Sequence, residues 1–201
     1  TGQVRLEGQG AVARVTLSHP GKLNAMSRSM WIALREVFTR LAREPRWRCV
    51  VIEGAGEAFC AGGDISEYPG FRFDPELLRH FHEAEVWGGL EAILACDVPV
   101  VAAIRGACMG AGVEIASCCD IRVAAEGSRF GAPIAKLGFP MAPREAALVA
   151  RVAGEAQLHA CLDTTPDVAR AADDVGQLIR ALTDAAGLRG DTYQVRMEVP
   201  A

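Results

Sequence analysis

The chain has 201 residues, enough for one domain with a substantial core, and half of them are hydrophobic, which excludes an intrinsically disordered chain. The 21 basic and 25 acidic residues give a net charge of −4 with the signs interspersed, without the basic clusters typical of nucleic-acid binding. The longest apolar runs fall well short of the roughly 20 residues that span a bilayer, and the first residues lack a signal-peptide pattern. We therefore expect a cytoplasmic protein with no nucleic-acid or membrane partner.

The first quarter of the chain predicts two strands, a helix and a third strand. β-branched residues mark 4–7 and 11–18 as strands that can pair as a hairpin. Ser27 is a good N-cap, and the apolar residues of 28–43 recur at helical spacing. The apolar run 48–54 is typical of a short buried strand.

The rest of the chain alternates between helices and strands. A loop of small residues, AGEAFCAGGD, follows the third strand, and the polar and aromatic stretch EYPGFRFD after it predicts a mobile loop. The further elements expected are helix 75–96, strand 98–104, helix 112–119, strand 121–125, helix 143–153 and helix 166–186. A hairpin followed by repeated strand and helix units predicts a layered α/β fold.

Two glycine-rich loops, GEAFCAGGD (56–64) and GACMGAGVE (106–114), each follow a predicted buried strand. Sites in α/β folds form at the carboxyl ends of strands, so both loops lie where chemistry is expected. Neither loop completes a dinucleotide fingerprint, because Phe59 and Ile115 stand where the third glycine is required. Neither contains the lysine followed by serine or threonine of a phosphate-binding loop.

The loops suit a site that stabilises negative charge on an oxygen. Backbone N–H groups at a helix N-terminus have no intrahelical partner, and two of them aimed at one point can hold an oxyanion. Gly62 and Gly63 can offer one N–H and Ala111 another, with the carboxylate of Glu114 about one turn further on to move protons. A structural alternative stays open, in which the glycines only make tight turns and Glu114 caps its helix as an N3 residue.

Taken together, these segments resemble the crotonase family, also called the enoyl-CoA hydratase and isomerase family. The resemblance covers roughly residues 4–153 and is carried by LSHPGKLNAMS, VVIEGAGEAFCAGGDISE and PVVAAIRGACMGAGVEIASCCDIRVAAEGSRFGAP. It implies a crotonase-type spiral of ββα units that assembles as a trimer or dimer of trimers and binds acyl-CoA thioesters. It also implies no separate cofactor, because coenzyme A is part of the substrate. We expect no metal site either, since no CxxC pair indicates zinc.

The resemblance assigns roles to individual residues. Gly63 and Ala111 would donate their N–H groups to the thioester oxygen, and Glu114 would be the catalytic carboxylate. The substrate-binding residues would be Lys22, Leu23, Ala25, Ala61, Asp64, Ile65, Met109, Gly110, Pro133, Ile134 and Gly138. Two of these have simpler interpretations, Lys22 as a solvated surface charge and Asp64 as a helix N-cap.

One departure from the family pattern bears directly on the chemistry. Family hydratases use two glutamates, and the second is expected after FG-x-P, where this chain has Ile134. Isoleucine can neither accept nor donate a proton, which puts both full hydratase activity and the usual isomerase mechanism in question. Glu67, Glu83 and Glu85 on the adjacent variable segment are candidates for the missing group.

Two expectations concern the segment between the loops. Residues 66–90 should line the acyl pocket. His80 and His82 are too close in sequence to share a helix face, so we expect both on the surface.

The end of the chain departs from the family as well. We interpret residues 1–153 as the crotonase-like core and residues 154–201 as a short, atypical helical tail that lacks a family segment near 157. The expected function is an enzyme that stabilises an enolate, first of all an enoyl-CoA hydratase. The alternatives are an enoyl-CoA isomerase or other enolate chemistry using one glutamate, and a non-catalytic acyl-CoA-binding protein.

Overall fold

The computed structural model describes residues 1–133 and 141–153. Its strands are β1 (Gln3–Gln9), β2 (Val12–Ser18), β3 (Cys49–Gly54), β4 (Val100–Ile104), β5 (Ala107–Met109), β6 (Ile121–Ala124) and β7 (Arg129–Gly131). Its helices are α1 (Arg28–Leu41), the 3-10 helix η1 (Ile65–Gly70), α2 (Pro75–His80), the π-helical η2 (Phe81–Val86), α3 (Trp87–Leu94), α4 (Ala111–Cys118) and α5 (Pro143–Ala153). Ile134, Gly138 and the whole expected tail, with its helix over 166–186, lie outside the described residues.

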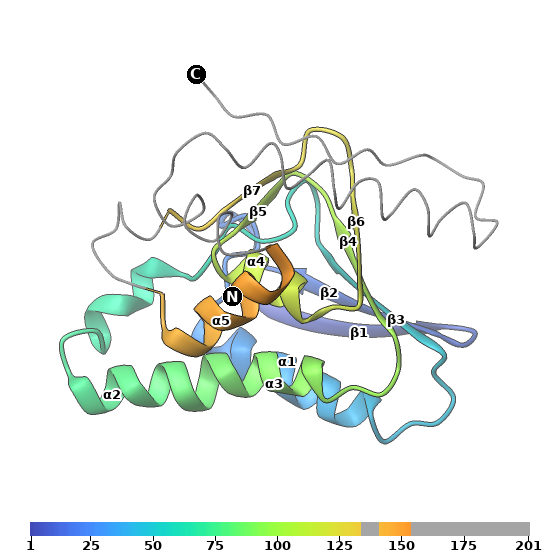
Figure 1. Ribbon diagram of the computed structural model, residues 1–201, viewed down its shortest axis with the longest axis horizontal. Helices are drawn as coiled ribbons and strands as arrows, with labels where there is room; N and C mark the ends of the chain where they lie inside the picture. The colour runs from blue at the N-terminus through green and yellow to red at the C-terminus, as the bar shows by residue number, and fades with distance from the viewer. Residues whose placement is uncertain (134–140, 154–201) are drawn as a thin grey trace.

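The main sheet runs in the order β1-β2-β3-β4-β6 (Figure 1). β1 and β2 form the expected antiparallel hairpin, and the strands from β2 to β6 pair in parallel. Parallel neighbours require crossover connections, which here contain α1, then the segment from η1 to α3, then α4. β5 and β7 form a second, small parallel sheet. The α/β fold expected from the sequence is confirmed.

Helix α1 shows how the sequence pattern becomes packing. The side chain of Ser27 accepts a hydrogen bond from the Met30 N–H at 3.3 Å, so the predicted N-cap is confirmed. The buried face of α1 consists of Met30, Trp31, Leu34, Phe38 and Leu41. This face packs against α3 and β1, and α1 and α3 lie side by side in Figure 1. Burying such large apolar side chains is the main stabilisation of this layer.

The segment between the two loops agrees with expectation in part. The expected helix over 75–96 is confirmed as a continuous helical stretch over 75–94, made up of α2, the π-helical η2 and α3. The stretch expected to be a mobile loop contains η1, and Phe71 at its end is buried with its ring centroid 4.5 Å from that of Phe81. Packing among the aromatic rings within this segment accompanies its ordered structure, and the polar composition of the stretch does not reveal it.

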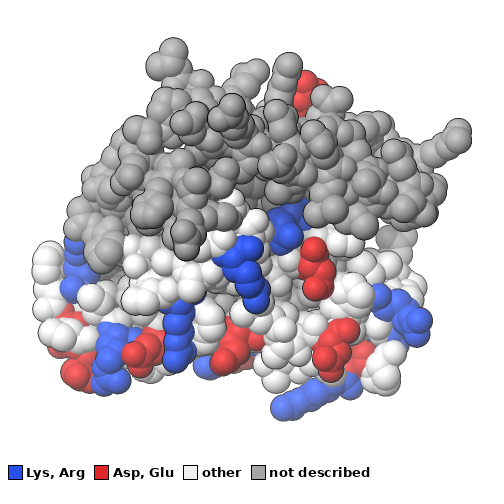
Figure 2. Space-filling model, viewed as in Figure 1, with Lys and Arg blue, Asp and Glu red and all other residues white. Residues whose placement is uncertain are grey.

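The surface agrees with the charge pattern of the sequence. Acidic and basic side chains alternate over the part of the face that is described in Figure 2. Within residues 1–133 and 141–153, no helix has the length and apolar character needed to cross a membrane.

Candidate active site

The two glycine-rich loops lie against each other and are joined through their backbones. The N–H of Cys60 donates to the Ala107 carbonyl at 3.0 Å, and the Met109 N–H donates to the Cys60 carbonyl at 2.8 Å. A Cβ at Gly112 would lie 2.8 Å from that same Cys60 oxygen, and a Cβ at Gly106 would lie 2.0 Å from a carbonyl oxygen of the first loop. The glycines are therefore required because one loop approaches the backbone of the other.

This pairing leaves two N–H groups unused by the backbone. Met26 bonds on either side of Gly63, accepting from the Asp64 N–H at 2.8 Å and donating to the Gly62 carbonyl at 2.8 Å. Ala111 is the first residue of α4, whose N–H has no intrahelical acceptor. Among the residues described, neither Gly63 nor Ala111 donates its N–H to a backbone carbonyl.

Both residues line a cavity of about 410 Å³. The residues predicted from the sequence that line it are Ala61, Gly63, Ile65, Met109, Gly110, Ala111, Glu114 and Pro133. Tyr68, Phe81, His82 and Val86 also line it, so part of segment 66–90 borders this cavity. That the cavity is the acyl pocket stays a prediction.

Glu114 projects into this cavity from the first turn of α4. The N-cap is Gly110, with φ +46° and no side-chain cap hydrogen bond, so Glu114 is one position beyond N3 and the capping alternative is wrong. Burial, and then the negative charge of Glu145, raise the pKa of Glu114 to about 8. At neutral pH this carboxyl group holds a proton much of the time, which suits a group that exchanges protons with a ligand.

Tyr68 is a cavity residue that the sequence did not single out. A Cβ at Gly63 would lie 2.8 Å from the Tyr68 hydroxyl, so the ring stands directly beside this glycine. Burial, and then the charge of Glu114, raise the pKa of Tyr68 to about 12, which keeps the phenol protonated. A small residue at 63 is therefore needed to fit the ring as well as any ligand.

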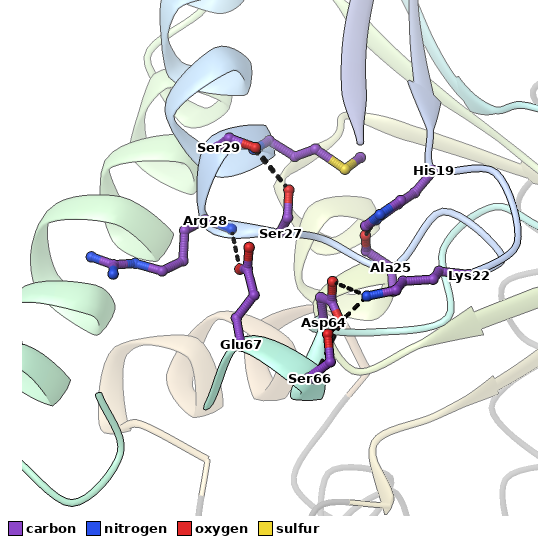
Figure 3. A network of polar contacts seen from close by, with 10 residues as sticks. His19, Lys22, Ala25, Ser27, Arg28, Ser29, Asp64, Ser66 and Glu67 are labelled. Carbon is purple, nitrogen blue, oxygen red and sulfur yellow. Dashed lines mark hydrogen bonds and ion pairs between the residues drawn. The ribbon is translucent and has the colours of Figure 1, made fainter. Parts of the chain in front are cut away.

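The residues around Lys22 form a separate polar network at the surface (Figure 3). The Lys22 ammonium donates to Asp64 Oδ2 at 2.6 Å and to Ser66 Oγ at 2.8 Å, so Lys22 is paired and its interpretation as a merely solvated charge is wrong. Asp64 accepts from the Ser66 N–H at 3.2 Å as the N-cap of η1, as the alternative predicted. Burial acts to raise the pKa of Asp64, but the hydrogen bonds from Lys22 and Ser66 outweigh it and lower that pKa.

The other predicted binding residues of this loop differ in exposure. Leu23 is 59% exposed and Ile65 56% exposed, whereas Ala25 is buried and its carbonyl oxygen lies 2.7 Å from His19 Nδ1. Lys22, Leu23, Ala25 and Asp64 do not line the cavity. Lys22, Leu23 and Ala25 lie on the loop before α1, and Asp64 lies at the start of η1. The loop contacts the cavity wall through Ala61, whose N–H donates to the Leu23 carbonyl.

None of the three candidate glutamates lines the cavity. Glu67 accepts a hydrogen bond from the Arg28 N–H at 2.7 Å, at the start of α1. Glu85 is buried and paired with the Arg28 guanidinium. Glu83 is exposed and lies 3.6 Å from Arg79. The structure thus places none of these three candidates for the missing group at the cavity.

The cavity instead contains Glu145, from the first turn of α5, and His82, from η2. Glu145 is only 3% exposed, and His82 is partly buried, contrary to the expected surface position. The sequence did carry a signal for Glu145, which precedes the buried Leu148 and Val149 by three and four positions and so belongs to the buried face of α5. No such signal marks His82, because a π-helical turn changes which side chains face inward.

Within the described ranges, no group of histidine, cysteine and acidic side chains has the arrangement of a metal site. The site thus consists of two backbone donors, two carboxyl groups, an imidazole and a phenol around an otherwise apolar cavity.

Solved structures with this arrangement of elements exist. The chain superimposes on the crystal structure of an enoyl-CoA hydratase/carnithine racemase from Magnetospirillum magneticum with a TM-score of 0.79 and 34% identity, covering 92% of this chain and 74% of that one. It also resembles an enoyl-CoA hydratase/isomerase family protein from Hyphomonas neptunium, with a TM-score of 0.78 and 28% identity over 92% of this chain and 74% of that one. The crotonase-type spiral expected from the sequence is confirmed.

Curated relatives cover a shorter stretch. The chain is 37% identical over 131 residues to "Probable enoyl-CoA hydratase echA14" of Mycobacterium tuberculosis, covering 64% of this chain and 49% of the relative. It is 32% identical over 135 residues to the human mitochondrial Delta(3,5)-Delta(2,4)-dienoyl-CoA isomerase, covering 61% and 40%. The matches thus span about half or less of these relatives' own length. The family model for enoyl-CoA hydratase/isomerase matches residues 7–192, and the chain belongs to this family.

Proposed function

We propose that this protein is an enoyl-CoA hydratase, an enzyme that adds water to a 2-enoyl-CoA thioester through an enolate. The observation that carries the proposal is that the Gly63 and Ala111 N–H groups, without backbone acceptors among the described residues, border the same cavity as Glu114. Coenzyme A enters as part of the substrate, and we propose no other cofactor. We further propose a cytoplasmic trimer or dimer of trimers, as the family resemblance implies.

The backbone donors address the main energetic cost of the reaction. Addition at Cβ moves an electron pair onto the thioester oxygen, and an unassisted enolate is a strong base. Donors held in place before the reaction stabilise that charge without reorganisation, and removal of one such donor typically costs about 3 to 4 kcal/mol. Gly63 is held by the pairing of its neighbours with Met26, and Ala111 by its place at the start of α4.

The proposed binding mode follows from the distribution of polarity. The acyl chain would occupy the cavity, whose walls include Trp31, Phe81 and Val86. The coenzyme A part would lie outward along the exposed Leu23 and Ile65, near the Lys22 ammonium. A lysine with 40% of its side chain exposed can contact an anionic phosphate while it remains bonded to Asp64.

The first test is turnover of crotonyl-CoA, followed by the loss of absorbance of the conjugated enoyl thioester. We expect the parent protein to hydrate it and Glu114→Gln to lose about 10² to 10⁴-fold in kcat, the usual range for a general acid or base. Glu83→Gln is the matched control, because it removes an exposed carboxylate and should leave kcat unchanged. Equal rates in Glu114→Gln and the parent would contradict the proposal.

Two alternatives differ from hydration in measurable ways. The similarity to a dienoyl-CoA isomerase favours double-bond migration as the second candidate, which would give an isomeric enoyl-CoA without a hydroxyl group in product analysis. Ile134 at the expected glutamate position favours a non-catalytic role, which predicts crotonyl-CoA binding without any product. That binding would be unaffected by Glu114→Ala.

A further inference from the structure

Glu145 is a carboxylate in the cavity that the proposed roles of Gly63, Ala111 and Glu114 leave unused. It is 3% exposed and enters the cavity from α5, on a different element from any of those three residues. A carboxyl group is rarely buried to this degree without a charged or polar partner. Among the residues that the structure describes, Nδ1 of His82 lies 3.6 Å from Oε1 of Glu145, just beyond hydrogen-bond distance.

His82 itself has an unusual nitrogen. Its Nδ1 is buried and, in the described part of the chain, has no hydrogen-bond partner. It comes from the π-helical η2, a form that often occurs at functional sites. An imidazole nitrogen beside a buried carboxylate, both at one cavity, is an arrangement suited to proton transfer.

A purely structural role for Glu145 is the competing explanation. Acidic side chains in the first turn stabilise a helix through its dipole, and Glu145 lies in the first turn of α5. An exposed side chain fulfils that role equally well. The dipole therefore does not explain why this carboxylate is buried, lines the cavity and acts on Glu114.

We propose that Glu145 is the second proton-transfer group of this site, replacing the glutamate that family hydratases carry where this chain has Ile134, and that His82 is its positioning residue. The inference rests on the proposed function and names the group that this function lacks.

The electrostatics of the pair support this assignment. The charge of Glu145 is the second cause, after burial, of the raised pKa of Glu114, so the two carboxyl groups interact. Repulsion from the Glu145 charge favours the protonated form of Glu114. In the described part of the chain, Cys60, Tyr68 and Cys118 are further titratable side chains that Glu114 affects, and His82 lines the same cavity.

The reaction balances when one of the two carboxyl groups starts ionised and the other protonated. The ionised member of the pair takes a proton from water as the water oxygen bonds to Cβ, and the electron pair of the double bond moves to the thioester oxygen. The protonated member then gives its proton to Cα as the enolate collapses. The proton taken from water then passes to the carboxyl group that protonated Cα. This transfer restores both carboxyl groups to their starting states, and one water has been added to the substrate.

The test compares Glu145→Gln with the parent protein and with Glu83→Gln in two assays. The first is hydration of crotonyl-CoA, and the second is exchange of the Cα protons of butyryl-CoA in D₂O, which needs proton transfer but no water addition. We expect Glu145→Gln to lose about 100-fold in both rates, with butyryl-CoA affinity and the melting temperature little changed. We also expect a smaller loss in His82→Phe that His82→Asn partly restores, because an amide can replace Nδ1.

The pH profile tests whether the two carboxyl groups interact, while the loss of rate in the two assays tests proton transfer by Glu145. Removal of the Glu145 charge lowers the free-energy cost of ionising Glu114. In the plot of the remaining Glu145→Gln rate against pH, the inflection that reflects the pKa of Glu114 should therefore move to lower pH.

The outcomes separate this inference from the proposed function. Parent activity that falls less than tenfold in Glu145→Gln overturns the inference and leaves the function standing. If the parent exchanges the Cα protons of butyryl-CoA but does not hydrate crotonyl-CoA, the proposed hydratase function is overturned. A tenfold or greater fall of that exchange rate in Glu145→Gln would still support the inference about Glu145. A parent that does neither overturns both. If Glu145→Gln does not fold, Glu145→Asp decides by the same tenfold criterion.

Discussion

Helices α4 and α5 start at the same cavity, and each carries a glutamate in its first turn, yet they are not equivalent. α4 begins with Ala111, whose N–H has no backbone acceptor among the described residues, whereas α5 begins with Pro143, which has no N–H at all. α4 therefore presents a donor and the carboxyl group of Glu114, and α5 presents only the carboxyl group of Glu145. A glutamate in the first turn of a helix thus has no fixed role until its neighbours are known.

The two helix starts are also held in different ways. Around α4, Gly110 has φ +46° and Gly112 lies so close to Cys60 that a side chain would collide with its backbone. The start of α5 is held by side-chain packing instead, with the Arg144 guanidinium 5.3 Å from the ring centre of Trp87. Backbone contacts tolerate little change, so substitutions at the start of α4 should have the larger effects.

The largest effect is expected when the first residue of α4 is replaced by proline, the residue with which α5 begins. Ala111→Pro removes the proposed donor at a position where proline is compatible with helix geometry. We expect kcat for crotonyl-CoA to fall by about 10² to 10³-fold, with a smaller effect on stability. The converse change, Pro143→Ala, adds an N–H to α5 and should leave kcat nearly unchanged. Similar kcat losses in both variants would show that the helix starts do not differ as we infer.

A second change tests the backbone contact at α4. Gly112→Ala places a Cβ 2.8 Å from the Cys60 carbonyl oxygen, and we expect a loss of about 1 to 3 kcal/mol in the free energy of unfolding, measured by urea denaturation. Gly88→Ala in α3 is the matched control, because its Cβ would meet only the flexible Arg35 side chain at 3.3 Å. That variant should be neutral or slightly stabilised, since alanine favours helix. Equal destabilisation of the two would argue against a tight approach at Gly112.

The third prediction concerns the pH dependence of stability. The pKa of Glu114 is about 8 in the folded protein, above its ordinary value of 4.5, so between these pH values the folded state binds more protons than the unfolded state. The free energy of unfolding should therefore fall as pH rises from about 4.5 to 8, at most by a few kcal/mol. Glu114→Gln should remove this decline in thermal melts. A decline of the same size in Glu114→Gln would assign it to another group.

The smallest effect is expected away from both helices. Lys22→Gln removes the ion pair with Asp64, which is partly exposed, so stability should change by no more than about 1 kcal/mol. The pKa of Asp64 should rise toward its ordinary value, because Lys22 is one of the groups that lower it. We expect KM for crotonyl-CoA to increase while kcat stays the same. If kcat fell and KM stayed the same, Lys22 would act closer to the reacting atoms than its position outside the cavity indicates.

Most of the fold could be predicted from the sequence because its elements are encoded locally. The N-cap Ser27 and the apolar face of α1 are fixed by residues within a few positions of each other, and the alternating pattern of β2 similarly gives its buried side. The short strands β5 and β7 were missed, because three residues of each form a ladder only when the other is present. The helix over 75–96 was predicted, but its π-helical part η2 has no local sequence signal.

The sequence by itself determined the family, the two glycine-rich loops and the place of Glu114, since these depend on spacing along one stretch of chain. Only the tertiary structure decided which other side chains share that cavity. Glu67, Glu83 and Glu85 were equally acidic in the sequence, but packing pairs them with arginines or with the start of α1, while Glu145 from a later helix is buried beside Glu114. The physical reason is that periodicity can place Glu145 on the buried face of its own helix, but it does not reveal which residues of other elements that face meets.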